Sequence, residues 1–220
     1  MENKIIIELS DESGTIIVRT KDEQGVESIR QASHQEFMKL FEQSIEVKDF
    51  NSGLLPQNAL HYKRKQSSHE ISLLYEEPFA EMTYEKTTYP QFPLPRLVFR
   101  FRLSFGGQVL DEYVGVVEQG KITPESKMFH YPFGNVNNSG NICTGGNQLP
   151  RYKELRIVQS LPEHLLRLPN SDDHYRETRN QLGLYQRDLM EHLKDKDANY
   201  YYEKVLVTNG RTLQEFLEGE

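Results

Sequence analysis

Short segments in which apolar and polar residues alternate predict β-strands in the first half of the chain. Residues 4–20 place two β-branched runs around Asp-Glu-Ser-Gly, a pattern typical of a hairpin. In residues 97–103, Leu and Phe at every second position alternate with Val and Arg, as expected for a half-buried antiparallel strand. The strands predicted after the hairpin are 71–75, 80–86, 96–104 and 110–118. This order indicates an antiparallel meander.

Apolar residues at helical spacing predict helices near both ends of the chain. Ser33 and Glu36 form a capping-box pattern ahead of Phe37, and Thr212 with Glu215 repeats this pattern near the C-terminus. The other predicted helices are 161–168 and 171–196. The second of these begins with Ser and two Asp and ends in Lys, which suits the helix dipole.

Runs of strands followed by helices argue for an α+β fold. Residues 51–59 contain Gly and Pro and are typical of a joint between two parts of the chain. We therefore expect residues 1–50 to form an N-terminal β-hairpin and helix extension. Residues 51–220 would form the main domain, an antiparallel β-meander flanked by helices.

The segment 119–150 has little periodicity and is rich in Gly, Pro and Asn. About 30 residues without regular structure are uncommon in a compact domain unless the loop has a function. The segment holds Cys143, the only cysteine among the 220 residues. Neighbouring glycines would let another backbone approach the sulfur, and neighbouring Asn amides could stabilise an oxyanion. Since free cysteines are also among the most buried residues, these residues alone leave open whether Cys143 is a nucleophile or a core residue.

Composition and charge disfavour several other classes of function. Lys and Arg total 26 and Asp and Glu total 33, so the net charge of −7 disfavours binding to nucleic acid or to an anionic membrane. No apolar run approaches the ~18 residues of a membrane span, and a lone cysteine suits a reducing compartment, so we expect a cytoplasmic protein. The sequence has neither the Cys and His spacing of a zinc site nor a Gly-rich phosphate loop, so we predict no metal and no cofactor.

The segment from Asn135 to Cys143 resembles the active-site segment of ubiquitin-conjugating (UBC) enzymes. In that superfamily the Asn of a His-Pro-Asn motif precedes the catalytic Cys by the same eight positions. A prokaryotic branch, family D, typified by protein B of the PRTRC system, is similar over longer stretches. Those stretches are 92–98, 121–136, 140–146 and 148–150.

The resemblance implies a bacterial transferase with a UBC-like fold. Cys143 would accept the C-terminus of a ubiquitin-like protein as a thioester from a ThiF-like activating enzyme and pass it to an amine. Asn135 would order the loop and support the oxyanion. The residues expected to support the loop are Gly140, Asn141, Thr144 and His130. Operons of this family also encode a JAB-type peptidase, a further implied partner, and they suit plasmid maintenance or anti-phage defence.

The sequence departs from the motif of the eukaryotic enzymes on both sides of the cysteine. Thr144-Gly145-Gly146 replaces the usual Leu-Asp after it, and the chain has no Trp. Phe133-Gly134 occupies the place of His-Pro. The acid on the acceptor side is also unassigned. Asp172 and Asp173 are candidates for it, and their alternative interpretation is a solvated helix start.

Two other functions stay open. The same fold could be a binding module that presents a ubiquitin-like protein while its thiol stays inert. Alternatively, Cys143 could serve a cysteine hydrolase, which needs an imidazole within hydrogen-bond reach of the sulfur. The histidines considered for that role are His130 and His164.

Overall fold

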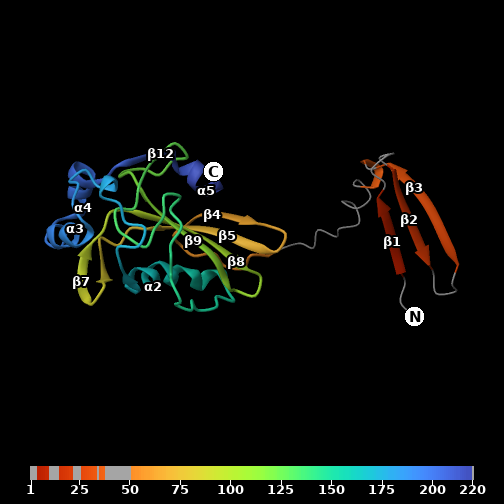
Figure 1. The fold of residues 1–220 in the computed structure, drawn as a ribbon, viewed down its shortest axis with the longest axis horizontal. Helices are drawn as coiled ribbons and strands as arrows, with labels where there is room; N and C mark the ends of the chain where they lie inside the picture. The colour runs from red at the N-terminus through yellow and green to blue at the C-terminus, as the bar shows by residue number, and fades with distance from the viewer. Residues whose placement is uncertain (1–3, 10–14, 22–25, 34, 38–50, 220) are drawn as a thin grey trace. The chain divides into compact units, whose positions relative to one another are not determined.

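The computed structural model describes residues 4–9, 15–21, 26–33, 35–37 and 51–219 (Figure 1). Contacts divide the chain into two units, Met1–Asn51 and Ser52–Glu220, and each unit has its own β-sheet. Strands and helices are both present, which confirms the mixed α+β class. Among the described residues, no helix has both the length and the apolar character that crossing a membrane requires.

The first unit contains a three-stranded antiparallel sheet in the order β1-β2-β3. Its strands are β1 (Lys4–Leu9), β2 (Thr15–Lys21) and β3 (Glu27–Ser33). The first two confirm the predicted hairpin, whereas β3 is not among the predicted strands because its sequence is mostly polar. Ser33 N–H donates to Glu36 Oε2 (3.0 Å) and Glu36 N–H to Ser33 Oγ (3.2 Å), which confirms the capping box. Most of the helix predicted after it lies outside the described residues.

The second unit is built on a six-stranded antiparallel sheet in the order β12-β10-β9-β8-β5-β4 (Figure 1). Its strands are β4 (Ala59–Arg64), β5 (Ser68–Tyr75), β8 (Leu97–Ser104), β9 (Val109–Val117), β10 (Lys127–Phe129) and β12 (Thr208–Thr212). β5, β8 and β9 confirm three predicted strands of the meander.

A second, smaller sheet is inserted between β5 and β8. β6 (Phe79–Tyr84) and β7 (Thr87–Pro93) form a hairpin, and β11 (Pro169–Asn170) runs parallel to β6. Pro90 lies where the register shifts and two residues of β7 oppose one of β6, so its missing N–H removes no regular ladder bond. β11 leads directly into the segment that contacts the cysteine loop.

The helices of the second unit are short. They are η1 (Leu155–Ser160, 3-10), α2 (Leu161–Arg167), η2 (Glu177–Arg179, 3-10), α3 (Gln186–Leu193), α4 (Ala198–Tyr200), η3 (Tyr201–Val205, π) and α5 (Leu213–Glu218). α2 has a proline in its first turn and α5 has a capping box, as predicted.

The helix predicted over 171–196 is wrong for its first half. Residues 171–185 form turns and the short η2 helix, and the α-helix begins only at Gln186. Ser171 does not cap a helix, because its hydroxyl donates to Asn135 Oδ1 (2.8 Å) across 36 residues. Gly183 has a φ of +61°, which an α-helix does not contain. A tertiary contact therefore overrides a charge pattern that suits a helix.

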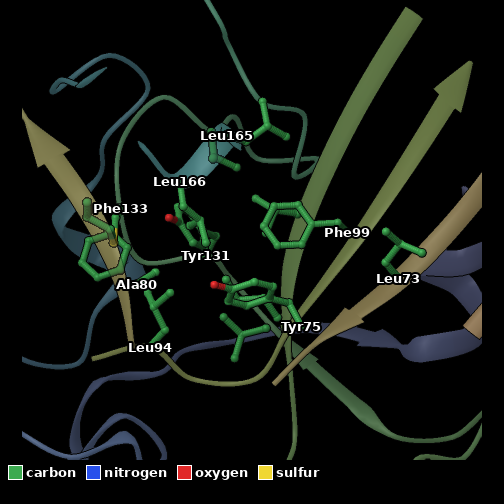
Figure 2. Packing of buried hydrophobic residues seen from close by; sticks show 14 of the residues in the cluster. Leu73, Tyr75, Ala80, Leu94, Phe99, Tyr131, Phe133, Leu165 and Leu166 are labelled. Carbon is green, nitrogen blue, oxygen red and sulfur yellow. The ribbon is translucent and has the colours of Figure 1, made fainter. Parts of the chain in front are cut away.

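The larger core lies on one face of the main sheet. The alternating residues of β8 that are buried in it are Leu97, Phe99, Phe101 and Leu103. Figure 2 shows Phe99 facing Tyr131 and the two leucines of α2, Leu165 and Leu166, with Phe133 on the other side of Tyr131. Because Phe133 immediately precedes the cysteine loop, the core anchors the start of that loop.

The C-terminal helix covers the other face of β8 at its beginning. Val98 is fully buried with Leu213 and Phe216 of α5. Further along the strand, the Arg100 guanidinium lies over the Tyr113 ring at 4.3 Å from its centroid. The strand predicted to be half-buried is therefore buried on both faces where α5 packs against it.

Candidate active site

Residues 134–143 form a tight hairpin that pairs with β9. Within it, Val136 pairs with Ile142, and Cys143 N–H donates to the Asn135 carbonyl (2.7 Å). Two backbone hydrogen bonds join the hairpin to β9: Val114 N–H donates to Gly140 O (2.8 Å) and Ile142 N–H to Glu112 O (2.9 Å). The main sheet therefore fixes the backbone beside the sulfur.

The tip of the hairpin depends on the backbone conformation of Gly140 and on the side chains of Asn137 and Asn141. Gly140 has a φ of +88°, and a Cβ at this position would lie 2.7 Å from the Val114 carbonyl oxygen, so only glycine fits without strain. Asn137 Oδ1 accepts from the N–H groups of Ser139 (2.9 Å) and Asn141 (3.0 Å). Asn141 Nδ2 in turn donates to the Glu112 carbonyl (3.2 Å). Gly140 and Asn141 thus both hold the hairpin against β9.

Asn135 connects the hairpin to the segment after β11. Its Oδ1 accepts from Ser171 N–H (3.2 Å) and Ser171 Oγ (2.8 Å), and its Nδ2 donates to Pro169 O (3.1 Å). Its own N–H donates to Asp173 O (2.6 Å). Since an amide nitrogen carries two hydrogens, one Nδ2 hydrogen has no partner among the described residues.

Phe133 and Gly134 hold the loop where the eukaryotic motif has His-Pro. Phe133 is fully buried, and its ring lies 5.5 Å from Phe92 and 5.3 Å from Tyr131 between centroids. Gly134 lies so close to the Ser171 carbonyl oxygen that a Cβ would overlap it. An aromatic anchor and a close backbone approach thus position this end of the loop.

Cys143 is partly exposed, and the fold brings two titratable side chains to its sulfur. Cys143 Sγ, an Asp173 carboxylate oxygen and a His174 ring nitrogen all lie within 4.8 Å of one another. His174 Nε2 is 3.8 Å from Asp173 Oδ2, and both side chains are about half exposed, at 47% and 57%. Neither His130 nor His164 belongs to this group.

The two acid candidates have different surroundings. Asp173 belongs to the group around the sulfur, whereas Asp172 Oδ1 accepts from the Tyr84 hydroxyl (2.9 Å). Burial and this bond to Asp172 raise the pKa of Tyr84 to about 12. Neither aspartate begins a helix, so their interpretation as a helix start is wrong.

Comparison with known protein families identifies the family of the chain. Residues 35–209 match the model of prokaryotic E2 family D. The chain belongs to prokaryotic E2 family D. This confirms the resemblance, and it implies a UBC-like fold and a ubiquitin-like protein as partner. Comparison with the curated proteins and with the solved structures gave no match.

One residue of this candidate site, Arg179, has no recognisable signal in the sequence. It is 4% exposed, and it donates from Nη1 to Val136 O (2.5 Å) and from Nη2 to Asn138 Oδ1 (2.6 Å). Burial, and repulsion by Arg176, lower the pKa of its guanidinium. Because η2 carries Arg179, this helix is bonded to the first strand of the hairpin, whereas β9 pairs with the second.

Thr144 and His130 flank the loop. Burial raises the pKa of Glu112, and a hydrogen bond from the Thr144 side chain opposes this shift. Thr144 O also accepts from Asn147 N–H (3.2 Å), which closes the turn after the cysteine. Burial, then repulsion by Arg179 and Arg211, lower the pKa of His130.

The group around the sulfur also has the donor atoms of a zinc site. Thiolate, imidazole and carboxylate are all zinc ligands, although the sequence spacing predicts no metal. Structural zinc sites almost always use four protein ligands, whereas catalytic ones use three and a water. Cys143, Asp173 and His174 could therefore hold zinc only in the second, open arrangement.

Replacing Gly134 with alanine should destabilise the protein. The added Cβ would overlap the Ser171 carbonyl, and such overpacking costs about 1–3 kcal/mol. Chemical denaturation of Gly134→Ala measures this cost. Gly146→Ala is the matched control, because a Cβ there meets nothing within 4 Å, and it should change stability by less than about 0.5 kcal/mol. Equal effects of the two substitutions would contradict the close approach.

His130 should make the protein less stable in acid. Its folded pKa lies below the ordinary value of 6.5, so the folded state binds fewer protons than the unfolded state as pH falls through 6.5. Stability is therefore lost from pH 6.5 downward. Denaturation between pH 7 and pH 5 should show a smaller loss for His130→Gln than for the wild type. Parallel curves for the two proteins would rule out this contribution.

Proposed function

We propose that this E2-family protein carries a ubiquitin-like protein as a thioester on Cys143 and transfers it to an amine. The observation that carries the proposal is the position of Cys143 Sγ within 4.8 Å of His174 and Asp173. The hairpin that bears the sulfur is hydrogen-bonded to β9 and to the segment after β11, and the thiol remains partly exposed. A reachable, positioned thiol is what acyl transfer to sulfur requires.

The first step is an exchange of thioesters. The Cys143 thiolate attacks the thioester carbonyl that links the ubiquitin-like protein to the activating enzyme. A new sulfur–carbon bond forms, and the cysteine of the activating enzyme leaves as a thiolate. Bonds of one type are broken and formed, so this chain needs no cofactor for the step, and ATP is consumed earlier by the ThiF-like enzyme.

The second step is attack by an amine on the carrier thioester. The amine nitrogen forms a bond to the carbonyl carbon, the Cys143 thiolate leaves, and the nitrogen loses a proton. His174 is the group that takes this proton, directly or through one water, since its ring lies beside the sulfur. Asp173 lies next to this ring, with its Oδ2 3.8 Å from His174 Nε2.

Asn135 has two roles in this proposal. Its carbonyl and Oδ1 order the loop, through Cys143 N–H and Ser171 respectively. Its second Nδ2 hydrogen is available for the oxyanion that forms when the amine attacks. The further partners we propose are the ThiF-like activating enzyme and a JAB-type peptidase of the same operon.

A cysteine hydrolase is the second candidate, because His174 supplies an imidazole close to the sulfur. Two observations favour transfer over hydrolysis. Cys143 N–H donates to Asn135 O, so the backbone donor beside the sulfur is not free for an oxyanion. Asp173 and His174 are also about half exposed, which leaves room for an incoming amine. A hydrolase would cleave C-terminal esters of the ubiquitin-like protein without ATP or an activating enzyme.

A thioester assay tests the proposed function. With ATP, the activating enzyme and the ubiquitin-like protein, we expect an adduct that a reducing agent removes. Cys143→Ser should give an adduct that resists reduction, because it is an oxyester, and Cys143→Ala should give none. An adduct at another residue of the Ala variant would contradict the assignment, whereas a stable complex without any adduct would favour the binding module.

Removing the His174 imidazole should slow transfer to the amine and spare loading. General-base catalysis is worth about 10²–10⁴-fold, so His174→Gln should discharge a preformed thioester to lysine about 10²-fold more slowly. Single-turnover gels separate loading from discharge. His192→Gln is the control, since His192 bonds to Tyr200 on α4 and lies outside the group at the sulfur. If both variants discharge at the wild-type rate, His174 is not the base.

A further inference from the structure

We propose that a basic pocket beside Cys143 binds an anionic group of the acceptor, so that the preferred acceptor is a lysine with acidic neighbours. This inference rests on the proposed transfer function. The pocket has a volume of about 380 Å³. The residues that line it are Asn137, Asn138, Ser139, His174, Arg176 and Arg179.

The two arginines give this pocket a positive charge that the described residues do not neutralise. Arg179 is 4% exposed, and both of its hydrogen bonds go to neutral oxygens. Its Nε is buried and has no partner at all in the described part of the chain. Arg176 is exposed and forms no ion pair with any described residue, including its neighbour Glu177. Since buried charges are normally paired, this arrangement points to an anion from outside the chain.

Neutral hydrogen-bond donors complete the pocket. Asn138 Oδ1 accepts from Arg179, and Asn137 Oδ1 accepts from Ser139 and Asn141, so the oxygen of each amide is engaged. The two Nδ2 groups have no partner among the residues that the structure describes. Two amide groups and two guanidinium groups are donors that suit a carboxylate.

The position of His174 assigns the pocket to the acceptor. This residue lines the pocket and also lies within 4.8 Å of Cys143 Sγ, so an occupant of the pocket ends beside the thioester and the proposed base. Asp173 is the acidic group next to His174, but it does not line the pocket. A lysine ammonium alone would be repelled by the arginines, whereas a neighbouring carboxylate would pair with Arg176 and hold the amine at the sulfur.

Discharge of a preformed Cys143 thioester to two matched peptides tests this inference. Both peptides carry one lysine, flanked by glutamates in the first and by glutamines in the second. We expect the wild type to discharge to the glutamate peptide about fivefold faster than to the glutamine peptide at low salt. A ratio of this size corresponds to the contribution of one exposed ion pair. Arg176→Gln should lose this preference. Arg156→Gln should keep it, because Arg156 is an exposed residue whose ion pair is with Glu154.

The outcomes separate this inference from the proposed function. Equal discharge to both peptides by an intact thioester overturns the acidic preference and leaves the transfer function in place. If Arg176→Gln instead slows thioester formation, the pocket serves the ubiquitin-like protein and the acceptor assignment is wrong.

A binding measurement tests the pocket without any thioester. Inorganic phosphate is titrated into the full chain while the His174 ring resonances, assigned by their loss in His174→Gln, are followed by NMR. We expect a saturable shift in the wild type and in Arg156→Gln, and its loss in Arg176→Gln. An unchanged His174 resonance in the wild type, or equal shifts in all three proteins, would overturn the anion pocket even if no thioester forms.

Discussion

The hydrogen bonds of Asn135 connect its own segment to the two others that make the candidate site, the one that contains Cys143 and the one that begins at Pro169. Its carbonyl accepts the Cys143 N–H, and its side chain bonds to Ser171 and Pro169 after α2. Without these bonds, fewer interactions would hold the hairpin at β9 against the segment that carries His174. Asn135 has a φ of +56°, a conformation in which Asn is several-fold enriched among residues other than glycine. Backbone conformation and side-chain chemistry therefore favour the same residue.

The same packing of segments around the hairpin brings basic side chains to the cysteine loop. Arg179, which η2 carries, donates hydrogen bonds to the hairpin. Its partners are a backbone carbonyl and an amide oxygen rather than a carboxylate. Burial lowers the pKa of His130, and repulsion by this arginine and by Arg211 lowers it further. The chain as a whole is acidic, at −7, yet the pocket at the loop tip is basic. A local field of opposite sign to the net charge acts only over about a Debye length, roughly 8 Å at physiological salt.

Much of the fold could be predicted from the sequence, because alternating segments such as 97–103 record which face of a strand is buried. The exceptions have physical causes. β3 is polar on both faces, and the helix predicted from residue 171 fails because Ser171 bonds to Asn135 rather than to its own segment. Cys143 and Asn135 could be singled out because their spacing is local. His174 and Arg179 could not be singled out. They lie 31 and 36 positions after Cys143, and only the folded chain brings them to the hairpin.

The close approach of Gly134 to Ser171 also has a consequence for the evolution of this site. A mutation that gives position 134 a side chain pushes the Ser171 backbone away, and His174 lies only three residues further on. Positions 134, 135 and 171 are therefore expected to vary together among descendants of this chain, rather than one at a time. A lineage that acquired a larger residue before Asn135 would have to rebuild the acceptor side of the site in the same period.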